Sequence, residues 1–434
     1  MADRDDEKRI ALALERRRSA AADAWRLADE IVLIGAGAPI PVPGRGDLTY
    51  PFRAHSDYYY LTDRDRPGGV LVFDPHEGWL DFRPPVDESA AVWLGGAVED
   101  GEGPTTDALR GWLASRARRP VACLGAPPDG VEFDADLSRE LGLSLATIRR
   151  RKDGLELERM RFAEGATRAA FRTVVPLLRE GVTERAAQIE LEAEAFRAGA
   201  DAMAYETILA SGPNSAALHF APTARPMRAG ELVLIDAGAE YRRYSSDITR
   251  TYPVDGTFTS EQQELHSLVR AAELAAIELC LSGEEWRDVH LAAARVMAEG
   301  LVSCGILRGE PDSLIESGAL WLFFPHGIGH LVGLGIRDAG GTLADRRDDP
   351  PPFPHLRIDL PLEPGMVVTV EPGIYFIAAF LENAEKRRRH RDEVAWERVD
   401  RMLDFGGIRV EDNVLITETD HEVITNDVPL LGGN

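Results

Sequence analysis

Two aspartates interrupt strand-like runs in the segment ELVLIDAGAEYRRYSSDITRTYPV, residues 231–254. Asp236 follows four apolar residues, and Asp247 precedes a second strand-like run. A hairpin symmetric about residues 241 and 242 would place the two acids opposite each other, with Cβ atoms about 4.5–5.5 Å apart. Carboxylates that close repel unless one is protonated or a cation lies between them. The alternative is an exposed β-ribbon whose acids are simply solvated, but the apolar run before Asp236 favours a buried site.

Two histidines lie four residues apart in the apolar, glycine-rich stretch WLFFPHGIGHLVGLG. His326 and His330 are flanked by glycines, which permit close approach of the backbone. The residue after His326 is glycine, so the pattern is not the HExxH motif of a zinc protease helix. Core histidines with both ring nitrogens satisfied are the alternative, but the spacing favours a functional pair.

Two further acids stand on apolar strands, Glu371 in MVVTVEPGIY and Glu411 in IRVEDNVLI. Arg409 lies two residues before Glu411, on the same strand face, where it can orient a carboxylate, and it is also a candidate substrate-binding residue. An edge position would explain one such acid but not the whole set. Four carboxylates and one imidazole suit Mn²⁺, Co²⁺, Fe²⁺ or Zn²⁺, and bridging carboxylates can hold two ions roughly 3.5–4 Å apart. The candidate ligands are Asp236, Asp247, His330, Glu371 and Glu411.

The ordered motifs LIDAGAEY, DITRT, PHGIGH, TVEPGIY and GGIRVED resemble those of the pita-bread metallopeptidases. The resemblance covers about residues 155–425, and YPFRAHSDYYYLT (50–62) resembles the N-terminal domain of the proline-specific branch. It implies an α/β (α+β) fold, with a small N-terminal α/β domain before a catalytic domain built on a curved, mostly antiparallel sheet. Members of this branch are commonly homodimers.

The resemblance also implies roles for individual residues. The five candidate ligands would hold two divalent metal ions, Mn first, with Co, Zn and Fe as alternatives. His219, in NSAALHFAP, matches a family histidine that assists at the scissile bond, and His326 matches another active-site histidine. Two cations lower the pKa of a water molecule between them, so that a hydroxide attacks the scissile carbonyl. Glu371 would then carry the proton to the leaving nitrogen.

The substrate depends on the branch. Both candidate branches cleave Xaa-Pro bonds: prolidases act on dipeptides and aminopeptidase P on longer peptides. The segment DDPPPFPHLRIDLPLEPGM is longer than the connection typical of aminopeptidase P. Its Arg357 falls where prolidases place an arginine that binds the dipeptide's C-terminal carboxylate. We therefore expect an Xaa-Pro dipeptidase, with an Xaa-Pro aminopeptidase as the alternative, and a solvated loop arginine as the alternative for Arg357.

One position departs from the family pattern. After the metal histidine both branches usually read VHD, whereas this chain reads Ile336-Arg337-Asp338. Arg337 could stabilise the oxyanion in place of that histidine, or it could turn away and pair with an acid such as Asp338 or Glu411. A third class consists of metal-free relatives that bind proteins or hydrolyse creatine, but these typically lack several ligands and here all five are present.

The surrounding sequence predicts the elements that position these residues. The chain divides near residue 150, giving an N-terminal domain over 1–150 and a catalytic domain over 151–434. The patterns after residue 365 are strand-like. Helices are predicted over about 5–30, 183–199, 259–280 and a charged insertion at 381–403.

Composition limits the partners. The 434-residue chain has a net charge of −24, which argues against nucleic acid or an anionic membrane as a partner. The basic run KRRRHR lacks interleaved aromatics and does not change this interpretation. The three cysteines are widely spaced and the first residues are too charged for a signal peptide, so we expect a cytoplasmic protein. Short proline-containing peptides are the expected partners.

Overall fold

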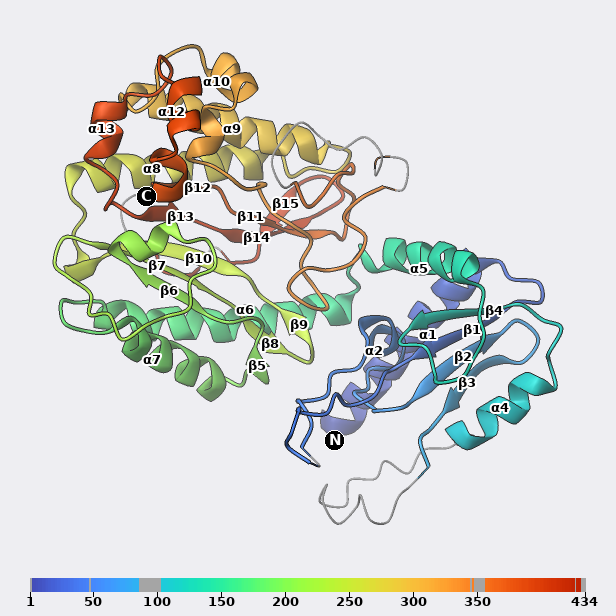
Figure 1. Ribbon diagram of the computed structural model, residues 1–434. Helices are drawn as coiled ribbons and strands as arrows, with labels where there is room; N and C mark the ends of the chain where they lie inside the picture. The colour runs from blue at the N-terminus through green and yellow to red at the C-terminus, as the bar shows by residue number, and fades with distance from the viewer. Residues whose placement is uncertain are drawn as a thin grey trace. The chain divides into compact units, whose positions relative to one another are not determined.

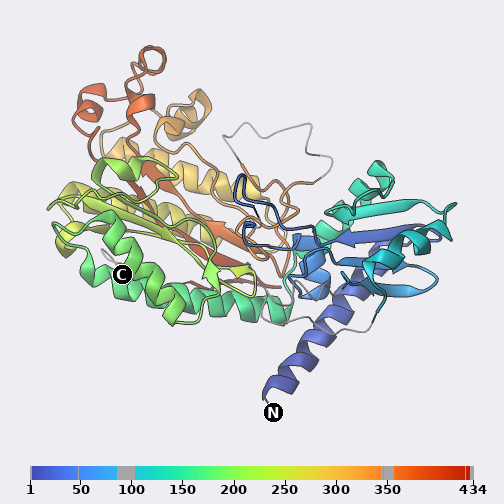
Figure 2. The same cartoon turned by 60° about the horizontal axis from the view of Figure 1, so that its bottom comes forward.

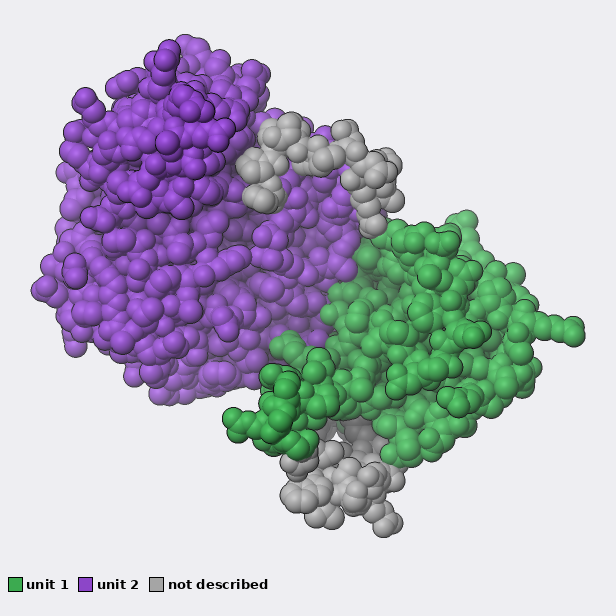
Figure 3. Space-filling model, in the orientation of Figure 1, with its two compact units in different colours: residues 1–149 green, residues 150–434 purple. Residues whose placement is uncertain are grey.

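The chain forms two compact units, Met1–Arg149 and Arg150–Asn434, coloured green and purple in Figure 3. Each unit buries a hydrophobic core of its own. The predicted α/β (α+β) fold class is confirmed, since both units combine helices with sheets. The computed structural model describes residues 2–46, 48–85, 103–343, 346, 356–425 and 427–430.

A four-stranded mixed sheet in the order β3-β2-β1-β4 organises the N-terminal unit (Figure 1). β1 runs parallel to β4 and antiparallel to β2, and β2 pairs antiparallel with β3. The central strands β1 and β2 are buried throughout, as their apolar sequences IVLIG and VLVFD require. The elements are α1 (Ala2–Trp25), β1 (Ile31–Gly35), α2 (Ser56–Thr62), β2 (Val70–Asp74), β3 (Gly78–Phe82), α4 (Thr106–Ala114), β4 (Val121–Gly125) and α5 (Ala135–Arg149).

Helices cover both faces of the strands in the C-terminal unit (Figures 1 and 2). α6 (Gly154–Val174) and α7 (Glu184–Arg197) lie on one side, and α8 (Ser260–Glu278) and α9 (Trp286–Ser303) lie on the other. β7 (Leu232–Ala237) is therefore buried on both faces, which explains its continuous apolar run.

Short antiparallel sheets form the middle layer. Their strand orders are β10-β7-β6, β11-β14-β15, β12-β13 and β5-β8-β9. Single bridges join Thr249 to Glu411 and Leu331 to Val368, so segments far apart in sequence meet around one region. The remaining strands are β5 (Ala202–Met203), β6 (Ile208–Ser211), β8 (Ala239–Tyr241), β9 (Tyr244–Ser245), β10 (Ile248–Pro253), β11 (Val367–Val370), β12 (Gly373–Tyr375), β13 (Gly407–Arg409), β14 (Asp412–Ile416) and β15 (His421–Val423).

The long helices begin at capping residues that are visible in the sequence. The Thr183 hydroxyl accepts from the Ala186 amide at 3.1 Å, as its position before α7 predicts. Thr259 and Gln262 form a capping box at the start of α8. The predicted helices over 183–199 and 259–280 are therefore confirmed to within two residues at each end.

The predicted hairpin register is wrong by two residues. The turn is centred on Arg242 and Arg243, both at positive φ, the backbone of a two-residue type I′ turn. Asp236 consequently pairs with Thr249 rather than with Asp247. The physical reason is that a two-residue type I′ turn matches the twist of the strands. It centres the hairpin between residues 242 and 243 instead of between 241 and 242, and this shift of one position changes each pairing by two residues. A slip of two keeps side chains on the same face, so the two acids still converge.

The charged insertion is helical only in short pieces. α11 (Ala378–Leu381), α12 (Ala384–Arg389) and α13 (Trp396–Asp400) follow β12, and α10 (Pro311–Ser317) lies near them in Figure 1. Arg387 forms two 2.9 Å hydrogen bonds to Asp400, so part of the KRRRHR run is satisfied within the insertion. Across the described parts of the chain, every helix is too short or too polar to traverse a lipid bilayer.

Candidate active site

The five candidate ligands come from five separate segments. Asp236 lies near the end of β7, Asp247 just before β10, His330 on the segment after residue 322, Glu371 just after β11, and Glu411 between β13 and β14. Asp236, Asp247, His330 and Glu411 are each at most 8% exposed. Asp247, His330 and Glu411 each present a ligand atom within 4.8 Å of the other two. Glu371 joins them, since its Oε1 lies 3.8 Å from His330 Nε2.

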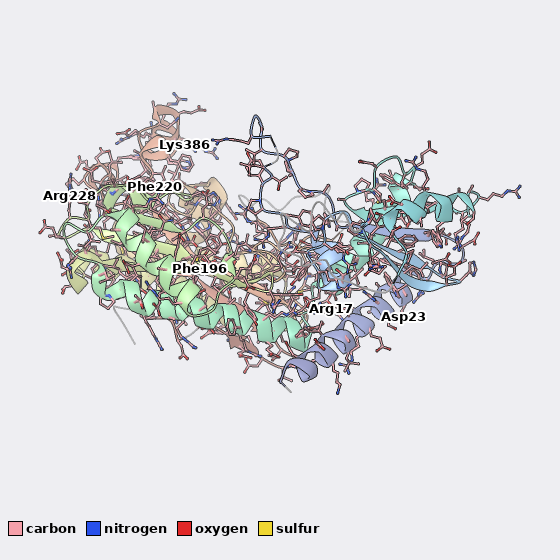
Figure 4. All side chains as sticks on the ribbon, turned by 90° about the horizontal axis from the view of Figure 1, so that it is seen from below. Arg17, Asp23, Phe196, Phe220, Arg228 and Lys386 are labelled. Atoms are coloured by element: carbon pink, nitrogen blue, oxygen red, sulfur yellow. The ribbon has the colours of Figure 1, made fainter. Side chains whose placement is uncertain are left out.

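All ten residues singled out in the sequence line one cavity of about 590 Å³. The acids and His330 form its buried part, whereas His219, Arg337 and Arg357 are exposed at its wall. Phe220, which follows His219 in the sequence, lines the same cavity, and it is labelled in Figure 4. The ten residues are His219, Asp236, Asp247, His326, His330, Arg337, Arg357, Glu371, Arg409 and Glu411.

Tyr205, which sequence reasoning missed, joins the two opening aspartates. Its hydroxyl lies 2.5 Å from Asp236 Oδ1 and 2.6 Å from Asp247 Oδ1. Burial and the negative charges of Asp236 and Asp247 raise the pKa of Tyr205 well above its usual value, so the phenol remains a donor. A tyrosine 31 residues before Asp236 carries no local signal for this role, because only the folded chain brings it between the acids.

The four carboxylates lie close together and are largely buried. Burial raises the pKa of Glu411 well above its usual value, and the charges of Asp247 and Glu371 raise it further. Burial likewise raises the pKa of Glu371, against the opposing effect of His330. Such a cluster is unfavourable unless positive charge offsets it. Its donor set of carboxylates and one imidazole therefore fits hard or borderline divalent cations.

His330 is oriented as a ligand should be. Its Nδ1 lies 3.1 Å from the Leu331 carbonyl oxygen, and a proton shared with that carbonyl leaves the Nε2 lone pair facing the acids. Nε2 lies 3.4 Å from Asp247 Oδ2. Burial lowers the pKa of His330, but Asp247 and Glu371 outweigh it and the net shift is upward.

β10 fixes the position of Glu411. The Thr249 hydroxyl donates to Glu411 Oε2 at 2.6 Å, and the Thr249 carbonyl accepts from the Glu411 amide at 3.0 Å. The buried guanidinium of Arg250 donates to the Glu411 carbonyl oxygen and to Asp412 Oδ1, each at 2.6 Å. Neither Thr249 nor Arg250 stood out in the sequence, since their partners lie about 160 residues away.

Arg409 and Tyr375 link Asp236 to His326. Arg409 donates to Asp236 Oδ2 at 2.6 Å and to the Tyr375 hydroxyl at 2.8 Å, and Tyr375 lies 2.9 Å from His326 Nε2. Burial lowers the pKa of His326 to about 3, so its imidazole is neutral at physiological pH. The guanidinium of Arg409 is occupied by protein partners. The substrate-binding role predicted for it stays a prediction, and the geometry favours orientation of Asp236.

The exposed wall of the cavity is cationic. Although His219 is exposed at the cavity wall, partial burial of its ring lowers its pKa, and the positive charges of Arg337 and Arg409 lower it further. Burial and the neighbouring charge of Arg337 also lower the pKa of Arg357. Arg337 and Arg357 are therefore close enough to repel each other.

Most of the chain matches known proteins. Residues 158–418 match metallopeptidase family M24, and residues 14–102 match the N-terminal domain of aminopeptidase P. A probable Xaa-Pro aminopeptidase of Botryotinia fuckeliana is 32% identical over 397 residues, covering 88% of this chain and 86% of the relative. A probable Xaa-Pro aminopeptidase of Verticillium alfalfae is 32% identical over 428 residues, covering 93% of each.

The similar solved structures are also aminopeptidases of the P type. Zinc-substituted Escherichia coli aminopeptidase P in complex with product superposes with a TM-score of 0.78 at 30% identity, covering 97% of this chain and 96% of that chain. The Pseudomonas aeruginosa aminopeptidase PepP gives a TM-score of 0.77 at 29% identity, covering 96% and 95%.

The prolidase interpretation drawn from the sequence is wrong in this light. The relatives and solved structures are aminopeptidases of the P type, and the N-terminal match is to the aminopeptidase P domain. The error came from Arg357 and the length of the segment before it. A single exposed arginine at a cavity wall can meet many parts of a peptide and does not measure substrate length. With its site and both of its matched regions in place, the chain belongs to metallopeptidase family M24.

Proposed function

We propose that this protein is an Xaa-Pro aminopeptidase, which removes the N-terminal residue of peptides whose second residue is proline. As a member of family M24 it is a metal-dependent hydrolase. The observation that carries the proposal is the single cavity lined by four carboxylates, three histidines and three arginines that the motifs singled out. The similarity of the relatives named above to Xaa-Pro aminopeptidases supports the substrate class.

Asp236, Asp247, His330, Glu371 and Glu411 would hold two divalent ions. When bound, the ions supply a water nucleophile at neutral pH and polarise the scissile carbonyl. Tyr205 and Arg409 restrict the rotation of Asp236. Thr249 does the same for Glu411, so each carboxylate is aimed before any substrate enters.

Glu371 is the proposed proton carrier. Its carboxyl is adjacent to His330 and is the least buried of the four acids, with its side chain 20% exposed. It can therefore reach both the floor of the cavity and a bound peptide. A proton taken from water at Glu371 would be delivered to the proline nitrogen, which must be protonated to leave.

The neutral histidines are the proposed partners of the peptide itself. His219 and His326 line the cavity, and the pKa of each is lowered, primarily by burial. A neutral imidazole can donate to a carbonyl oxygen without repelling the substrate's N-terminal ammonium group. His326 is held in place by Tyr375, whereas His219 is exposed at the cavity wall.

Manganese is the metal we propose first, because carboxylate-rich sites favour hard ions, and cobalt, zinc and iron remain alternatives. The homodimer implied by the family resemblance is also a proposal. Light scattering on the purified chain would test it, and a mass near the 47.6 kDa of one chain would reject it.

Hydrolysis of matched peptides tests the proposed function. Protein supplied with Mn²⁺ should cleave Ala-Pro-Leu between alanine and proline, and should cleave Ala-Pro at least ~10-fold more slowly, because the dipeptide lacks contacts beyond proline. Ala-Ala-Leu serves as the control for proline. Chelation should abolish cleavage, and added Mn²⁺ should restore it.

Two outcomes would reject the proposal. Equal or faster cleavage of Ala-Pro would mean that contacts beyond proline do not contribute. Full activity after exhaustive chelation would mean that the carboxylate cluster is not a metal centre.

A further inference from the structure

The loop over residues 331–341 runs from His330 along the cavity and carries Arg337. Several backbone bonds hold it. The Asp338 amide donates to the Leu331 carbonyl at 2.9 Å, and the Gly333 carbonyl accepts from Ser245 at 3.0 Å. The Arg150 side chain donates from Nε to the Gly340 carbonyl at 2.5 Å. The loop is thus tied to the first residues of the C-terminal unit.

A fully buried ion pair joins this loop to Lys152. Lys152 Nζ is 2.8 Å from Asp338 Oδ2, and the two side chains are 0% and 1% exposed. Lys152 Nζ also lies 3.3 Å from the Arg150 carbonyl oxygen. Gly333 covers the pair so closely that a Cβ there would lie 2.4 Å from Lys152 Cε and 2.6 Å from Asp338 Oδ2. The space is shaped around these two groups.

Stability alone does not account for such a pair. Removing two charges from water costs about as much as their attraction returns, and apolar residues of similar volume commonly serve equally well. The pair instead fixes the orientation of the loop at Asp338. The Asp338 side chain is buried against Lys152, whereas the adjacent Arg337 is exposed and lines the cavity.

Arg337 needs such a restraint because of its neighbour. The charge of Arg337 contributes to the lowered pKa of Arg357, so the two guanidinium groups repel each other. Without a restraint, this repulsion would favour loop conformations in which Arg337 lies farther from Arg357. The buried pair opposes that movement.

We propose that Lys152 is a positioning residue: through its buried ion pair with Asp338 it holds Arg337 at the cavity wall, where Arg337 contacts the peptide substrate. The inference rests on the proposed aminopeptidase function for its kinetic readout. Lys152 and Asp338 both lie outside the proposed metal cluster. In the sequence, the predicted site residue nearest to Lys152 is His219, 67 positions away.

A double-mutant cycle tests the proposal. Lys152→Met removes the charge and keeps most of the side-chain length, and Arg337→Gln removes the guanidinium. In the unmutated background Lys152→Met should lower kcat/KM for Ala-Pro-Leu by roughly 10-fold or more, since a misplacement of about 1 Å can cost on the order of 100-fold. In the Arg337→Gln background the same change should alter kcat/KM by less than ~2-fold, because the group it positions is already gone.

The matched control removes an arginine partner from another buried acid, which keeps a second arginine, Arg116, 3.4 Å away. Arg119 donates to Asp74, whose side chain is 0% exposed, in the N-terminal unit. Arg119→Met should lower the melting temperature as Lys152→Met does, but it should leave kcat/KM of the folded enzyme within ~2-fold in either background. If Lys152→Met does not fold, Lys152→Met/Asp338→Asn, which removes both charges of the pair, takes its place in the cycle.

Metal content and amide exchange complete the test. Metal content should stay that of the unmutated protein in every variant, and hydrogen exchange should accelerate in residues 331–341 with Lys152→Met but not with Arg119→Met. Equal effects of Lys152→Met in both backgrounds, a loss of metal, or unchanged exchange in the loop would overturn the proposal. If the unmutated enzyme cleaves no Xaa-Pro peptide, the proposed function fails, and amide exchange alone then decides whether Lys152 holds the loop.

Discussion

Arg409 Nη2 donates to Asp236 Oδ2 at 2.6 Å, and both residues are buried. The same guanidinium donates to Tyr375 and Thr249, so its planar fork is matched to three acceptors. Lysine cannot reproduce that geometry. Arg409→Lys should lower activity roughly 10- to 100-fold by releasing Asp236, as removal of a ligand's partner usually does.

The measurement for Arg409→Lys is kcat/KM together with metal affinity, with Arg401→Lys as the control because Arg401 is exposed and lies outside the cavity. Unchanged metal affinity would show that Arg409 does not orient Asp236.

Asp247→Asn should remove a charged ligand and leave the fold largely intact. Asparagine preserves the volume and one oxygen but loses the negative charge that a divalent cation requires. Metal per chain should fall, and most of the activity should be lost. Asp392→Asn, at a carboxyl that is 83% exposed, is the control. Normal cleavage with two bound ions would mean that the site is misassigned.

Tyr205→Phe isolates the hydroxyl that joins the two aspartates. The ring would still fill its place, but Asp236 and Asp247 would lose a shared donor at 2.5 and 2.6 Å. Metal affinity should fall by about 10-fold or more, whereas the melting temperature should change little. Calorimetric titration with Mn²⁺ measures the first quantity. A titration that matches the unmutated protein would show that Tyr205 only fills space.

Arg337→Ala separates the two roles open to that residue. If the guanidinium donates to the oxyanion, kcat should fall by roughly 10²–10³. If it only contacts the peptide, the loss should appear mainly in KM. A kcat within a factor of ~3 of the unmutated value would exclude the oxyanion role, and the cavity would then rely on His219, His326 and the metal ions.

Burial of His290 should make the folded protein less stable in acid. It is fully buried and stacks on Trp321 with ring centroids 5.5 Å apart, and burial lowers its pKa to about 4 from 6.5. Because His290 binds a proton more readily in the unfolded chain than in the folded one, the free energy of unfolding should decrease as the pH falls from about 6.5 toward 4. Urea unfolding at pH 7 and pH 5 should show a smaller loss for His290→Gln than for the unmutated protein. Equal losses would contradict the prediction.

Local patterns were enough to identify the five candidate ligands. They were also enough to predict where the long helices begin. Acids interrupting apolar strands were recognisable at Asp236 and Glu411, since a charge in a buried run needs a partner. The cap at Thr183 was recognisable because its partner is three residues away.

The strand register and the substrate branch could not be obtained in this way. The register depends on whether the turn is centred at 241–242 or at 242–243, and both are acceptable from composition alone. The interpretation of Arg357 required knowing what else lines the cavity wall, and Arg337 is brought there by a loop from a different part of the chain.

What the sequence by itself determined is a set of candidate metal ligands, because acids and a histidine within apolar runs can be recognised from local patterns. What only the tertiary structure decided is how they are held. Tyr205, which bridges two aspartates, Arg409, which pairs with Asp236, and Lys152, which pairs with Asp338, are ordinary residues in sequence. Their roles come from contacts across 31 to more than 170 positions, and the chain's local preferences carry no information about partners that distant.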